Sequence, residues 1–136
     1  MILLDAGYLI ALMHSGDSLH QRARKWVLAF REPLVVTEFV ICEAVDAFSM
    51  PMDRPKAHAL VTRLRTDPNI EIIPASADLF ENGLQFHAKR SDKAWSLTDC
   101  ISFVVMQRRG ILHALAHDHH FEQAGFEALL RREPPR

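Results

Sequence analysis

Five short apolar runs alternate along the chain with longer segments in which apolar residues recur with the period of a helix. The runs are Ile2–Leu4, Leu34–Val36, Ile70–Ile73, Ile111–Leu115 and Phe126–Leu130. Strands that alternate with helices are joined by crossover connections, which make neighbouring strands parallel and place helices on the faces of the sheet. The sequence therefore predicts an α/β fold with a mostly parallel, five-stranded sheet flanked by helices on both faces.

The helical segments carry their own start and stop signals. Thr37 is a suitable N-cap for a helix that runs to about Phe48, before Pro51. Gly110 is suited to end a helix that begins near Leu97. Three further apolar stripes predict helices: one after Asp17 (Leu19, Ala23, Trp26, Val27, Phe30), one entered through Pro55 (Ala57, Leu60, Val61, Leu64) and one that contains Leu79, Phe80, Gly83, Leu84 and His87.

Length and composition indicate one domain, residues 1–136, because no repeat or flexible linker divides the chain. Its 16 Lys and Arg against 17 Asp and Glu exclude a strongly basic nucleic-acid-coating protein and an acidic disordered tail. Two cysteines, Cys42 and Cys100, make neither a disulfide framework nor a zinc-ligand pair. Since no apolar run approaches the roughly 20 residues of a membrane span and the start lacks a basic secretory region, we expect a cytoplasmic protein with no membrane partner.

Two acidic residues follow predicted strands. Asp5 comes directly after the first apolar run, and Asp118 follows the fourth after Ala116 and His117. Parallel sheets bind their ligands beyond the carboxyl ends of the strands, so both acids are expected at the edge where chemistry takes place. Each could instead be an ordinary helix N-cap.

Two more acids lie in predicted helices. Glu43 is in a helix that is apolar nearly all round, so we expect it to be at least half buried and to need a partner, either an arginine or a metal ion. Asp99 ends the motif Ser96-Leu97-Thr98-Asp99, which resembles a capping box. A capping role and a role in a site are compatible at this position.

Four clustered carboxylates require a cation, since two unit charges about 4 Å apart repel by about 4 kcal/mol at an effective dielectric of about 20. Oxygen-only ligands favour Mg²⁺ or Mn²⁺, and such ions assist attack of water on phosphodiesters. Without metal, the protein is then expected to be least stable at or above neutral pH. A zinc site in the segment His117-Asp118-His119-His120 is disfavoured, because adjacent histidines are expected to point in different directions.

Together these residues resemble a known family. The resemblance rests on Asp5 after an opening strand, Glu43 within Glu38-Phe39-Val40-Ile41-Cys42-Glu43-Ala44, the run Ser96-Leu97-Thr98-Asp99-Cys100, and Asp118-His119-His120-Phe121 followed by Gly125-Phe126. In this order, over essentially the whole chain, they look like a PIN domain, and more narrowly like the VapC-type toxins of toxin–antitoxin pairs.

The resemblance implies a ribonuclease that hydrolyses RNA with the help of Mg²⁺ or Mn²⁺. Carried over by position, the catalytic and metal-binding acids would be Asp5, Glu43, Asp99 and Asp118, and the Thr98 hydroxyl would support them. It also implies a cognate antitoxin as partner and allows a homodimer.

The chain departs from the family's pattern at two places. Ala6 and Gly7 follow the first acid where the family commonly has Ser or Thr, and Ala116 stands where a Thr is common before the last acid. Loss of such supporting hydroxyls weakens metal binding by about 10–100-fold. The alternative is therefore a catalytically weak or inactive PIN-like domain that binds RNA or a partner protein without cleavage.

Two further interpretations concern other segments. Lys89, Arg90 and Lys93 precede the Asp99 helix and form either a solvated loop or a local RNA-binding patch in a nearly neutral protein.

A signalling receiver domain also binds Mg²⁺ with carboxylates on a small α/β fold. It would need an acid after the third strand, where this chain has Pro74-Ala75.

Overall fold

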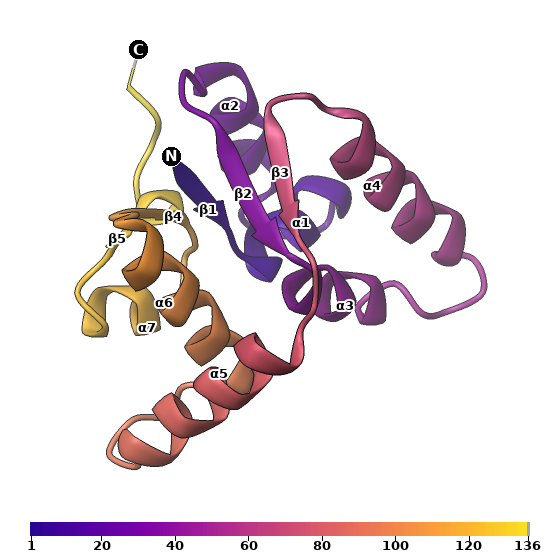
Figure 1. The fold of residues 1–136 in the computed structure, drawn as a ribbon. Helices are drawn as coiled ribbons and strands as arrows, with labels where there is room; N and C mark the ends of the chain where they lie inside the picture. The colour runs from indigo at the N-terminus through magenta and orange to yellow at the C-terminus, as the bar shows by residue number, and fades with distance from the viewer. Residues whose placement is uncertain (136) are drawn as a thin grey trace.

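The computed structural model describes residues 1–135 and shows a five-stranded, all-parallel sheet in the order β3-β2-β1-β4-β5 (Figure 1). The strands are β1 (Ile2–Leu4), β2 (Leu34–Thr37), β3 (Ile70–Ile73), β4 (His113–Leu115) and β5 (Glu127–Ala128). The helices are α1 (Ala6–Met13), α2 (His20–Ala29), α3 (Glu38–Asp46), α4 (Arg54–Thr66), α5 (Ala77–Lys89), α6 (Leu97–Arg109) and α7 (His119–Gln123). The predicted α/β class is confirmed.

The first strand of the chain lies at the centre of the sheet. β1 pairs with β2 on one side and with β4 on the other, with Leu3 opposite Val35 and Leu4 opposite Leu115. The direction of chain progression therefore changes between β1 and β4. In open parallel sheets, this switch point at the carboxyl ends of the strands is where ligands bind.

Each face of the sheet is covered by its own helices. Ile2 and Leu4 belong to one buried cluster, which includes side chains of α1, α2 and α4. Leu3, which points the other way, belongs to a second cluster with α5, α6 and α7. Because strand side chains alternate between faces, the buried run Ile2–Leu4 serves both clusters at once.

Helices α3 and α6, next to the site, begin with side-chain caps. The backbone N–H of Val40 donates to Thr37 Oγ1 over 3.1 Å at the start of α3. At the start of α6, the N–H of Asp99 donates to Ser96 Oγ over 3.0 Å, and the N–H of Ser96 donates to Asp99 Oδ2 over 3.3 Å. This reciprocal pair is a capping box, as the sequence predicted.

The structure corrects several boundaries. The fourth strand begins at His113 rather than Ile111, and the predicted strand Phe126–Leu130 shortens to β5 because residues Leu129–Arg131 form a 3-10 helix. Sequence periodicity did not identify α1, which is buried over most of its surface and so lacks a polar stripe. It also missed α7, which is only five residues long.

Two negative findings apply to the described part of the chain. Among residues 1–135, no helix is long and apolar enough to cross a membrane. The two cysteines are both free, with Cys42 exposed and Cys100 buried.

Candidate functional site

Four acidic residues from separate segments line one cavity of about 360 Å³. Asp5 follows β1, Glu43 lies in α3, Asp99 is in the first turn of α6, and Asp118 precedes α7. The cavity opens at the carboxyl ends of β1 and β4, which is the switch point of the sheet. The arrangement places the four predicted site residues together, although their individual roles stay predictions.

Asp5 is the most buried of the four acids. The residue is 8% exposed, and its backbone N–H donates to Leu115 O over 3.1 Å, which fixes it between β1 and β4. Burial, followed by the negative charges of Asp99 and Glu43, raises the pKa of Asp5 to about 7. The nearby backbone N–H groups of Ala6 and Gly7 act in the opposite direction but do not outweigh these effects.

Glu43 lies at the rim of the cavity and is exposed, which corrects the expectation that it is at least half buried. The buried face of α3 is formed by Val40 and Ala44, so Glu43 projects beside that face rather than into it. Partial desolvation, and then the charges of Asp99 and Asp46, raise the pKa of Glu43 above its ordinary value. Among the described residues, no arginine forms an ion pair with it.

His120 joins the remaining two acids. Its Nδ1 lies 3.1 Å from Asp99 Oδ2 and 3.2 Å from Asp118 Oδ1, and its side chain is 18% exposed. Its backbone N–H also donates to Asp118 Oδ1, over 3.0 Å. Sequence reasoning assigned no role to His120. The available signal was its position two residues after a candidate acid.

His119 and His120 do not point apart, which corrects the reason given against a zinc site. His119 Nδ1 lies 3.4 Å from Asp118 Oδ1, and the two imidazole ring centres are 4.9 Å apart. Both rings fold back toward the residue that caps α7. Potential ligand atoms of Asp118, His119 and His120 lie within 4.8 Å of one another, but two of these residues are exposed and the group lies at the outer rim.

The donor set suits a hard divalent cation. Carboxylate oxygens are the preferred ligands of Mg²⁺ and Mn²⁺. After burial, which is the largest cause, the negative charges of Asp99 and Glu43 also raise the pKa of Asp5, and a cation among these acids would offset that repulsion. The residues present therefore fit such an ion on grounds of charge and chemistry.

The other residues expected around the acids occupy different places. Thr98 is half-buried in the first turn of α6 and is not among the residues that line the cavity, so its supporting role stays a prediction. Ala6 and Ala116 are buried, with exposed fractions of 3% and 0%. The methyl groups therefore occupy the positions where the resemblance expects hydroxyls.

The predicted basic patch adjoins the cavity through the loop between α5 and α6. Ala94 and Ser96 in this loop line the cavity. Arg90 lies over the ring of the buried Trp95 at 4.7 Å and forms an ion pair with Asp92 at 3.1 Å. Lys93 Nζ is 3.9 Å from the same carboxylate, and Lys89 is exposed at the end of α5. The patch therefore includes partly neutralised charges.

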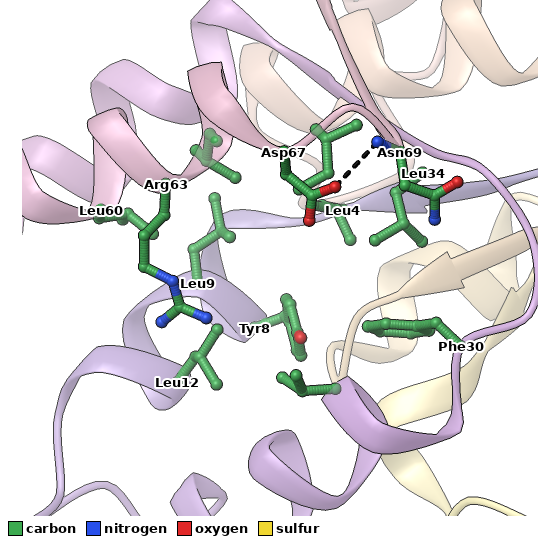
Figure 2. Close-up of a pocket in the computed structure, with 13 residues that line it drawn as sticks. Leu4, Tyr8, Leu9, Leu12, Phe30, Leu34, Leu60, Arg63, Asp67 and Asn69 are labelled. Carbon is green, nitrogen blue, oxygen red and sulfur yellow. Dashed lines mark hydrogen bonds between the residues drawn. The ribbon is translucent and has the colours of Figure 1, made fainter.

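A second cavity, of about 240 Å³, lies away from the acids, among α1, α2, α4 and the sheet. Figure 2 shows its mostly apolar lining, with Tyr8 and Phe30 on one side and Arg63 at another. Burial raises the pKa of the Tyr8 hydroxyl, and nearby Arg63 opposes this effect. Its lining includes none of the four acids, so it is separate from the candidate site.

Comparisons with known proteins agree with this geometry. The PIN domain family matches residues 2–127. The chain is 31% identical over 128 residues to the 23S rRNA-specific endonuclease VapC20 of Mycobacterium tuberculosis, across 93% of this chain and 95% of that protein.

Two solved structures share the fold. The crystal structure of VapC20 from M. tuberculosis, a Sarcin-Ricin loop cleaving toxin, matches with a TM-score of 0.87 at 24% identity, over 95% of this chain and 98% of that one. FitAcB from Neisseria gonorrhoeae matches with a TM-score of 0.65 at 16% identity, over 94% and 98%. The predicted resemblance is thus confirmed: the chain belongs to the PIN domain family and, within it, resembles the VapC-type toxins.

Proposed function

We propose that this protein is an endoribonuclease that depends on Mg²⁺ or Mn²⁺ and acts as the toxin of a toxin–antitoxin pair. The observation that carries the proposal is the convergence of Asp5, Glu43, Asp99 and Asp118 on one cavity at the switch point of the sheet. The 31% identity to an rRNA endonuclease over nearly the full length of both chains supports the same reaction class.

In this proposal the four acids hold the metal and orient what surrounds it. Buried Asp5 and half-buried Asp99 provide fixed carboxylates, while Glu43 and Asp118 lie more openly at the rim. When bound, the ion supplies activation of water and stabilisation of negative charge on the phosphate. Ala6, Gly7 and Ile10 of α1 line the cavity together with Asp5.

The substrate class that we propose is structured ribosomal RNA. Support comes from the similar protein VapC20, which is named as a 23S rRNA-specific endonuclease. We further propose that an antitoxin protein controls the activity in the cytoplasm, as the VapC-type resemblance implies, and that two copies of the chain can associate.

The alternative, a PIN-like domain that binds RNA or a partner without cleavage, is favoured by one observation. Ala6, which lines the cavity beside Asp5, and Ala116, which is buried two residues before Asp118, bring no hydroxyl. The two functions differ in whether the phosphodiester bond of RNA is broken.

Purified protein is expected to cleave ribosomal RNA when Mg²⁺ or Mn²⁺ is added and to stop when EDTA removes the ion. Gel analysis of end-labelled RNA measures this directly. A Glu81→Gln variant, which neutralises an exposed acid on α5 away from the cavity, serves as a control and should cleave normally. Binding of RNA with no cleavage at any metal concentration would support the binding-only alternative.

Alanine at both Lys89 and Lys93 is expected to weaken RNA binding without changing the cleavage position. If each lysine contacts one phosphate, the slope of log affinity against log salt decreases by roughly 0.7 per residue for a single strand. Fluorescence anisotropy in EDTA, across a salt series, measures the slope. Arg65→Ala on α4 is the control, and an equal loss in both variants would contradict a specific role for the α5–α6 loop.

A further inference from the structure

His120 makes the contacts that connect two of the four acids. Asp99 begins α6, whereas Asp118 lies on the connection between β4 and α7. Their carboxylates meet at His120 Nδ1, at 3.1 Å and 3.2 Å respectively. Because ionised carboxylates only accept hydrogen bonds, a nitrogen placed between two of them acts as the donor.

The two acids that His120 connects differ in their exposure and in the other contacts that hold them. Asp99 Oδ2 also accepts the N–H of Ser96 in the capping box, and the Asp99 side chain is 14% exposed. The Asp118 side chain is 46% exposed; it contacts His120 through both Nδ1 and the backbone N–H, and His119 Nδ1 at the longer distance of 3.4 Å. The His120 ring therefore links an exposed acid at the rim of the cavity to an acid that the capping box also holds.

The contacts use one oxygen of each carboxylate. Within the described residues, the hydrogen bonds and ion pairs of the Asp99 carboxylate involve Oδ2, and those of the Asp118 carboxylate involve Oδ1. The second oxygen of each acid takes no hydrogen bond within the described residues. This division leaves one acceptor on each side available for a cation.

We infer that His120 is a positioning residue, which sets the placement of Asp99 and Asp118 and thereby the affinity of the site for its divalent ion. The inference rests on the proposed function, since it concerns the same metal site. His120 acts through its hydrogen bonds to the two acids. Removal of a hydrogen-bond partner of a metal ligand weakens metal binding by about 10–100-fold.

The test compares two substitutions of His120. His120→Ala removes the donor and is expected to weaken Mn²⁺ binding by about 10–100-fold. His120→Asn keeps an N–H donor close to the position of Nδ1 and is expected to retain most of the wild-type affinity. Isothermal titration of the full chain with Mn²⁺, in the absence of RNA, measures binding independently of cleavage. Excess Mn²⁺ should restore RNA cleavage by His120→Ala.

His119→Ala is the matched control, because this neighbour is also an imidazole beside Asp118 but does not contact Asp99. Thermal unfolding of all variants without metal separates loss of the fold from loss of metal affinity. Wild-type Mn²⁺ affinity in His120→Ala would overturn the inference. Equal losses in His120→Ala and His120→Asn would also overturn it, because the imidazole would then bind the ion itself.

These outcomes are separate from a failure of the proposed function. If the wild-type protein cleaves RNA but the His120 variants bind Mn²⁺ normally, only the positioning role is contradicted. If the wild-type protein neither binds Mn²⁺ nor cleaves RNA, the proposed function is contradicted and the inference falls with it.

Discussion

Replacement of Asp5 by Asn is expected to abolish metal-dependent cleavage while it makes the metal-free protein more stable. The loss of activity should reach about 100-fold or more in kcat/KM, because a metal ligand contributes to several kcal/mol of charge stabilisation. The gain in stability has a different origin. Asp5 is 8% exposed and lies near two other acids, so its ionised form is unfavourable in the folded protein.

The pH dependence follows from the direction of this shift. The pKa of Asp5 is 3.8 in its ordinary state and about 7 in the folded protein. Between these values the folded state holds a proton that the unfolded state has lost, so the free energy of unfolding falls as pH rises from about 4 to about 7. The total loss is up to about 4 kcal/mol and is complete above neutral pH.

Urea unfolding of metal-free wild-type and Asp5→Asn protein, from pH 4 to pH 8, measures the free energy of unfolding and so tests both the gain in stability and its pH dependence. The two proteins should have similar stability at pH 4, and the variant should be more stable at pH 8. Saturating Mg²⁺ should raise the melting temperature of the wild type but have little effect on the variant. Asp53→Asn, which changes an acid outside the cavity, is the control. Parallel pH profiles for wild type and Asp5→Asn would contradict the raised pKa of Asp5, which burial causes first and the charges of Asp99 and Glu43 second.

Gly83→Ala is expected to destabilise the protein by about 2 kcal/mol and to lower its melting temperature by about 5–10 °C. A Cβ at this position would lie 2.3 Å from Ile101 Cγ1 and 3.4 Å from Ile101 Cα. This overlap outweighs the gain of up to about 1 kcal/mol that Ala usually has over Gly in a helix. Differential scanning calorimetry measures the change.

Two further variants test the cause of this loss. Ile101→Ala removes the atom that the new methyl group would meet, so the double variant Gly83→Ala/Ile101→Ala should be more stable than the sum of the single changes implies. Gly7→Ala is the matched control, because its Cβ would meet only Asp5 Oδ2, at an ordinary 3.6 Å. Additive losses in the double variant would mean that the contact between α5 and α6 does not limit packing.

The sequence was sufficient for the fold class because strand burial and helix signals are local. Ile2–Leu4 is buried on both faces, Thr37 and Ser96 cap their helices, and Gly110 ends α6 with a φ of 64°. It was not sufficient for the packing of α5. Of the stripe that predicted this helix, Phe80 is 41% exposed and Leu84 is 42% exposed, whereas Gly83 makes the close approach to α6.

The candidate site was predictable to the extent that it depends on topology. Acids that follow strands of a parallel sheet meet at one edge, which brings Asp5 and Asp118 to the same cavity. The role of His120 depends on how two side chains fold back at the start of a short helix, which no periodicity encodes. The exposure of Glu43 likewise depends on which neighbours α3 packs against, and the composition of that helix did not reveal this.

The central position of β1 has a consequence for synthesis of the protein. Asp5 is the first of the four acids to be synthesised, whereas the neighbouring strand β4, and Asp118 that follows it, are synthesised after the other three acids. A nascent chain that lacks β4 has an unpaired central edge and only part of the acid cluster. The enzyme that we propose therefore has no complete centre for cutting RNA until the ribosome has translated the codon for Asp118.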